Sequence, residues 1–175
     1  MTARRSRNPN GDALVAELKW VHDMIRRDLG TVRRLAAQVA AGLPASQARA
    51  GIRSLASNGP LWQLKVNCLQ YCHFVHSHHN HESASIFPAL RRSNPSLNPV
   101  VDKLEADHAR VADLLDQVEG AARALGGGDD PELRQRLVRA LTDLSTDLIA
   151  HLRYEEEQIS DTLRTWTNWP HQARR

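Results

Sequence analysis

The chain has 175 residues, of which 41% are hydrophobic and 25% are charged, so it is long and apolar enough for one domain with a packed core. Its 23 basic and 20 acidic residues give a net charge of +3, which is too small to indicate nucleic-acid binding. No run approaches the roughly 20 apolar residues of a membrane span, and two cysteines make no disulfide framework. We therefore expect a cytoplasmic protein that binds neither nucleic acid nor membranes.

Clusters of glycine and proline separate four long segments of the chain. The turn-forming clusters lie at 42–44, 58–60, 93–99 and 126–131. Within each segment, apolar residues recur at intervals of three and four, which is typical of a helix packed in a bundle. Four long helices with short connections predict an all-α protein, an up-down-up-down four-helix bundle. We place the bundle at residues 13–165, between a basic disordered tail at 1–12 and a C-terminal tail at 166–175.

The four apolar stripes can be read directly from the sequence. The first two run through Val15, Leu18, His22, Ile25, Leu29, Val32, Ala36 and Val39, and through Leu64, Cys68, Tyr71, Val75, His78, Glu82 and Ile86. The other two run through Val101, Leu104, His108, Val111, Leu115, Val118, Ala122 and Leu125, and through Leu137, Leu141, Leu144, Leu148, His151, Glu155, Ile159 and Leu163. Pro88 is expected to distort or end the second helix, and residues 45–57 to form a short extra helix or a crossover loop.

Each stripe carries histidine where an apolar residue is expected, and two stripes also carry glutamate. These residues are His22, His78, Glu82, His108, His151 and Glu155. In an antiparallel bundle that rises about 1.5 Å per residue, all six side chains fall at one level. A buried carboxylate needs a compensating charge or takes up a proton. A metal ion bound by imidazole and carboxylate meets that need, so we predict a metal site in the core of the bundle.

The spacing of histidine and glutamate suits one or two metal ions. His78 and Glu82 are four residues apart, as are His151 and Glu155, so both members of each pair point the same way from adjacent turns. Each pair can give one metal a nitrogen and an oxygen, or can bridge two metals through its carboxylate. The second and fourth helices are diagonal neighbours in this topology, so the two pairs face each other. Imidazole with carboxylate suits iron, and does not exclude manganese or zinc.

Four motifs in this order resemble the hemerythrin-like, or HHE cation-binding, proteins. They are WVHD at 20–23, HHNHE at 78–82 with IFP at 86–88, LEADH at 104–108 and HLRYEEE at 151–157. The resemblance covers about residues 14–163. It implies two iron ions, oxo- or hydroxo-bridged, with dioxygen, nitric oxide or peroxide as the small ligand. It also implies that Glu82 and Glu155 bridge the ions, and that the terminal ligands are His22, His78, His108 and His151.

One position departs from the oxygen-carrying members of that family. They place a second histidine one turn after the ligand of the third helix, where this chain has Ala112. His79, beside His78, is the expected substitute; otherwise one iron keeps an open or water-filled position. Glu156 and Glu157 lie off the stripe, so we expect them on a solvated face or behind the ligands. We expect His73, His76 and His81 outside the ligand set.

Three functions are compatible with this reading. The first is a protein that binds or senses dioxygen or nitric oxide. The second is an enzyme that acts on peroxide or nitric oxide, or that oxidises a small substrate at an open iron. The third is an iron-responsive module whose fold depends on the metal. The sequence leaves the oligomeric state open.

Overall fold

The computed structural model describes residues 8–42, 60–125 and 130–170, and these residues form helices and no strand. The elements are α1 (Pro9–Ala40), α3 (Pro60–His81), the π-helix η1 (Glu82–Ile86), α4 (Phe87–Ser93), the 3-10 helix η2 (Pro95–Leu97), α5 (Asn98–Ala124) and α6 (Pro131–Leu163). The segment 45–57, expected as an extra helix or a crossover, lies outside the described residues, as do residues 1–7 and 171–175 of the expected tails. Helix α1 begins at Pro9, inside the segment expected as the first tail.

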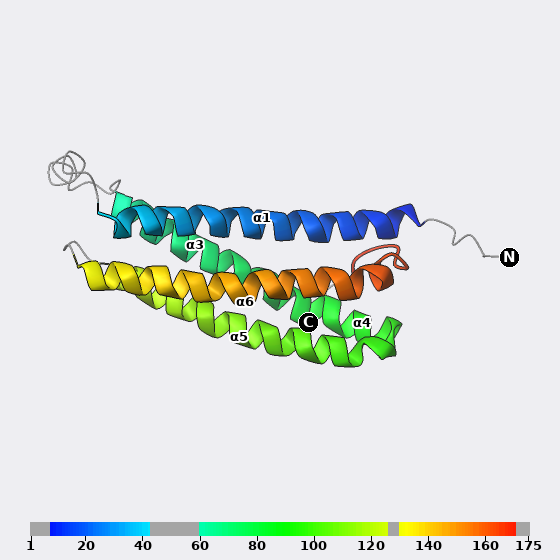
Figure 1. Ribbon diagram of the computed structural model, residues 1–175. Coiled ribbons are helices and arrows are strands. Elements are labelled where there is room, and N and C mark those ends of the chain that lie inside the picture. Colours follow the sequence, from blue (N-terminus) through cyan, green and yellow to red (C-terminus); the bar gives the residue numbers. More distant parts are fainter. Residues whose placement is uncertain (1–7, 43–59, 126–129, 171–175) are drawn as a thin grey trace.

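Successive long helices run in opposite directions, as Figure 1 shows. Helix α1 packs against α3 and α6, while α5 packs against the same two helices from the opposite corner. Helices α3 and α6 are therefore diagonal neighbours. The predicted all-α, up-down-up-down four-helix bundle is confirmed. Among the described helices, none combines the length and the apolar character needed to cross a membrane.

Proline and short polar side chains set the helix starts. Pro60 and Pro131 each occupy the first position of a helix, where proline is tolerated because the first N–H groups have no partner within the helix. The Asp130 carboxylate caps α6 by accepting hydrogen bonds from the backbone N–H groups of Glu132 and Leu133. Gly42, with φ of +90°, follows the end of α1 in a conformation that other residues rarely adopt.

The second long helix continues through Pro88 by widening one turn. Proline has no N–H, and its ring collides with the carbonyl group four residues earlier in an α-helix. The helix accommodates Pro88 by forming the π-helix η1, in which the N–H of Phe87 donates to the carbonyl of Glu82, five residues back. Helix α4 then continues to Ser93. The predicted distortion at Pro88 is thus confirmed, and it begins at a predicted metal ligand.

Polar residues divide the core into two apolar clusters. Every described position of the four predicted stripes is buried except His78, whose side chain stays 11% exposed. The larger cluster includes Ile25, Val75, Val111, Leu148 and Leu152. The smaller cluster includes Leu18, Ile86, Phe87, Leu104 and Ile159. Each helix passes from one cluster to the other through its histidine or glutamate, so the predicted polar residues share one layer.

Candidate metal centre

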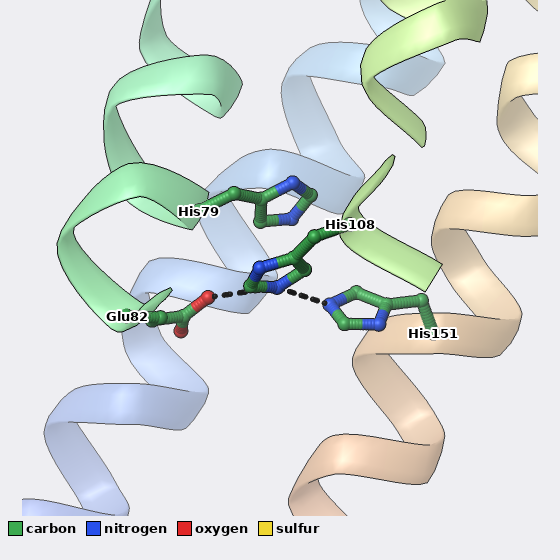
Figure 2. Close-up of side chains that lie close together, drawn as sticks. All are labelled: His79, Glu82, His108 and His151. Carbon is green, nitrogen blue, oxygen red and sulfur yellow. Dashed lines mark hydrogen bonds and ion pairs between the residues drawn. The ribbon is translucent and has the colours of Figure 1, made fainter. Parts of the chain in front are cut away.

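Two groups of side chains converge in the polar layer. The first comprises His79, Glu82, His108 and His151, whose potential ligand atoms all lie within 4.8 Å of one another (Figure 2). The second comprises His22, His78 and Glu82, under the same limit. The two groups share Glu82, and together they draw on all four helices of the bundle.

Glu82 turns one carboxylate oxygen toward each group. Its Oε1 atom lies 3.1 Å from Nε2 of His78 and 3.8 Å from Nε2 of His22. Its Oε2 atom lies 3.4 Å from Nε2 of His108. A carboxylate between two clusters of imidazole nitrogens is placed to bridge two cations, one on each side.

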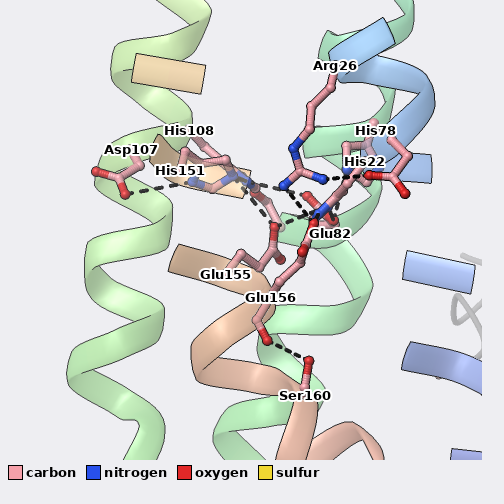
Figure 3. Close-up of polar contacts among 12 residues, drawn as sticks. His22, Arg26, His78, Glu82, Asp107, His108, His151, Glu155, Glu156 and Ser160 are labelled. Atoms are coloured by element: carbon pink, nitrogen blue, oxygen red, sulfur yellow. Dashed lines mark hydrogen bonds and ion pairs between the residues drawn. The ribbon is translucent and has the colours of Figure 1, made fainter. Parts of the chain in front are cut away.

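Glu155 faces both groups from the diagonally opposite helix (Figure 3). Its Oε2 atom lies 3.6 Å from Nε2 of His22 and 3.6 Å from Nε2 of His151. Glu82 and Glu155 thus approach the same space from α3 and α6, as their i, i+4 pairing with histidine predicted.

Nε2 of His108 and Nε2 of His151 lie 3.1 Å apart, but most other polar atoms at the centre lack hydrogen-bond partners within the described structure. Glu82, Glu155 and His22 have no solvent-exposed surface. The unpartnered buried atoms here include both carboxylate oxygens of Glu82 and of Glu155, and Nε2 of His22, His78 and His79. Buried polar groups are normally satisfied, and these atoms are the nitrogen and oxygen donors that iron, manganese and zinc prefer. The donor set therefore fits metal cations.

Burial controls the charge of these side chains. It lowers the pKa of His78 to about 3 and that of His108 to about 4, with neighbouring imidazoles adding to the effect. Burial also lowers the pKa values of His22, His79 and His151. The imidazoles are therefore neutral at pH 7, with lone pairs available to a metal, and their short contacts with carboxylates are not ion pairs.

The two central carboxyl groups shift in the opposite sense. Burial, assisted by the neighbouring Glu156, raises the pKa of Glu155 to about 8. Burial and the nearby Glu155 also raise the pKa of Glu82 well above its ordinary value. Without a cation, these groups hold protons near neutral pH; a bound cation favours their ionised form and displaces the protons.

Outer contacts orient two of the imidazoles. Nδ1 of His22 lies 2.9 Å from a carboxylate oxygen of Glu156, which also accepts a hydrogen bond of 2.8 Å from Arg26. Nδ1 of His108 lies 2.9 Å from Oγ of Ser83. Contacts of this kind leave Nε2 directed at the centre. Arg26 and Ser83 were missed in the sequence, because their partners lie on other helices and no spacing links them.

The structure brings His79 into the group that has a single histidine on α5. The ring of His79 is buried and stacks on that of His108, with centroids 4.1 Å apart. Ala112 stands one turn beyond His108 and offers no donor. His73 and His81 are exposed, and His76 lies 3.4 Å from Asp116 at the surface. No group of potential ligands found in the described part of the chain includes them.

Other polar core residues stay apart from the centre. Cys68 and Cys72 are buried free thiols in the larger apolar cluster, and burial raises the pKa of each to about 12. They therefore remain protonated and act as packing residues. Tyr71 belongs to the same cluster.

One cavity reaches the centre from outside. It has a volume of about 320 Å³ and is lined in part by His78 and Glu82, at the group with two histidines. The group with three histidines contributes no imidazole to its lining. The two halves of the centre therefore differ both in donors and in access.

The comparisons with known proteins agree with this geometry. The family model described as the hemerythrin HHE cation binding domain matches residues 50–163. That range contains every residue of the two groups except His22, which the fold of α1 brings to the centre. Searches of curated proteins and of solved structures give no match.

Proposed function

The chain belongs to the hemerythrin HHE cation-binding domain family, and on that premise we propose that it holds two iron ions and binds or senses dioxygen or nitric oxide. The observation that carries the proposal is the placement of Glu82, with one oxygen facing each of two histidine groups. A single cation would leave one of those groups of buried donors without a partner.

We assign the ligands by the two groups. His22 and His78 would hold one ion, while the other would be held by His79, His108 and His151. Glu82 and Glu155 would bridge them. The bound iron would supply a redox couple and an open coordination position for a small ligand.

The protein's own residues decide where that open position lies. Three imidazoles surround one side of the centre and two surround the other, so the second side has the incomplete donor set. The cavity lined by His78 and Glu82 opens at that same side. Apolar clusters above and below the layer exclude bulk water from the rest of the centre. A small ligand would therefore enter beside His78.

An enzymatic role is the second candidate, and the cavity supports it. A volume of about 320 Å³ exceeds what a diatomic ligand needs, since pockets for organic ligands begin at roughly 300 Å³. Reduction of nitric oxide, removal of peroxide or oxidation of a small substrate would use the same open side.

The test begins with iron analysis and the visible spectrum of protein purified in air. We expect about two irons per chain, absorption bands of a bridged diferric centre, and a spectral change when the reduced protein meets nitric oxide or dioxygen. Oxygen release after peroxide addition would favour the enzyme. Glu82→Ala and Glu155→Ala should each lose metal, whereas Glu157→Ala, at an exposed residue paired with Arg153, should keep it. Full iron retention in both central variants rejects the bridging assignment.

A further inference from the structure

The cavity beside His78 is walled by the segment that follows α6. Its apolar walls come from Leu18 and Val21 of α1, Ile86 of η1 and Trp169, while Glu82 and His78 lie at its inner end. Trp169 belongs to the described part of the segment expected as a C-terminal tail. It is partly buried and packs against the smaller apolar cluster.

Hydrogen bonds hold that outer wall in place. Nε1 of Trp169 donates to the carboxylate of Glu17 on α1 at 2.8 Å. The side-chain amide of Asn8 donates to the backbone carbonyls of Arg164, at 3.0 Å, and Trp166, at 2.8 Å. Nε1 of Trp166 donates to Oγ of Ser93 at 3.1 Å. These hydrogen bonds therefore tie the wall to the N-terminal part of α1, including its N-cap, and to the last residue of α4.

The metal-free lining offers no fixed positive charge to an anion. Of the described residues that line the cavity, none is a lysine or arginine; Glu17 and Glu82 carry carboxyl groups, and His78 and His81 carry imidazoles. Its size is at the lower end of pockets that take organic ligands. Apolar side chains from α1 and η1, together with an indole ring on the outer wall, suit one flat ring.

We propose that this cavity binds a small neutral organic molecule with a single apolar ring, between Trp169 and the side chains of His78 and Glu82. Binding depends on the apolar walls and needs no metal. The position of the ring next to a metal ion rests on the proposed function. If that function holds, the bound molecule would be the substrate or an effector of the metal centre at its open side.

The experiment uses toluene as the probe, because it is neutral and has no atom that ligates metal. Full-length protein, both chelator-treated and iron-loaded, is titrated while the indole N–H resonance of Trp169 is followed by NMR. We expect toluene to give a saturable shift in both forms, and benzoate to bind the chelator-treated form at least tenfold more weakly than toluene does. The absence of saturable toluene binding, or tighter binding of benzoate than of toluene to the chelator-treated form, would overturn the proposal.

Two variants test the location by opposite changes. Val21→Trp fills the cavity and Trp169→Ala removes its wall, so each should weaken toluene binding at least tenfold, measured for both by ligand-observed NMR. Trp20→Ala is the matched control, since Trp20 adjoins Val21 in sequence but is 62% exposed and lies outside the lining. Thermal unfolding verifies that each variant is folded. Unchanged toluene affinity in a folded Val21→Trp variant would contradict the proposed cavity site. Toluene binding by a protein that takes up no iron would contradict only the proposed function.

Discussion

Glu156 and His22 form a 2.9 Å hydrogen bond that joins α6 to α1. A carboxylate can only accept, so Nδ1 of His22 carries the proton and Nε2 keeps its lone pair. That lone pair points to Glu82 and Glu155, at 3.8 and 3.6 Å. Burial opposes ionisation of Glu156, but hydrogen bonds from His22 and Arg26 outweigh it and lower the pKa of Glu156. The sequence left open whether Glu156 was solvated; the structure places it behind a predicted ligand.

Replacing Glu156 by alanine should weaken binding of the metal next to His22 about 10- to 100-fold, because His22 loses the group that fixes its orientation. Glu156→Gln retains an acceptor oxygen and should recover part of that affinity. Titration against a competing chelator measures both. Glu157→Ala serves as the control, since Glu157 is 54% exposed and pairs with Arg153. An equal loss in Glu157→Ala would show that the effect comes from surface charge.

His79→Ala should weaken binding of the ion in the three-histidine group, so that fewer than two ions per chain survive gel filtration, because that ion loses one of its three imidazole donors. The remaining ion should stay with His22 and His78. His81→Ala should keep both ions, since His81 belongs to neither group. Metal analysis after gel filtration measures the number of bound ions. If His79→Ala retains both ions, His79 is not a ligand.

The metal-free protein should become less stable as the pH rises from 6.5 to 8. Burial raises the pKa of Glu155 from its ordinary 4.5 to about 8, so the folded chain holds a proton that the unfolded chain has released. Raising the pH through this window therefore favours unfolding. Histidines have an unperturbed pKa of about 6.5 and are largely neutral in both states above it. Thermal midpoints of chelated protein should fall across the window, and less steeply in Glu155→Gln; a flat or rising profile in the parent protein contradicts the shift.

Gly11→Ala should destabilise the fold by about 1–3 kcal/mol, the usual effect of overpacking. A Cβ atom on Gly11 would lie 2.2 Å from the carbonyl oxygen of Arg164, so the start of α1 could not pack against the end of α6. Gly30→Ala is the control in the same helix, because nothing lies within 4 Å of its Cβ position. It should stabilise slightly through helix propensity. Urea unfolding of both variants measures the difference.

The apolar stripes predicted the helices and the polar layer correctly because both follow from local periodicity. His22 and His108 lie on different helices but at the same height along the bundle axis, because the antiparallel topology leaves little freedom for the helices to slide along that axis. The partner of His22 could not be predicted, because it depends on the relative rotation of α1 and α6. The sequence did not place Trp169 at a cavity, since no periodic pattern follows Leu163.

The wide turn at Glu82 has a geometric effect on the helix that contains it. Side chains spaced by four advance about 40° beyond a full turn of an α-helix, so the seam from His78 would spiral away from the interior. The π-helix absorbs this advance, and Glu82, Ile86 and Leu90 all remain buried. It resets the rotational phase of the helix between α3 and the shorter α4. The part of the helix that bears the imidazoles and the part that carries Phe87 can therefore each turn a buried face toward the neighbouring helices.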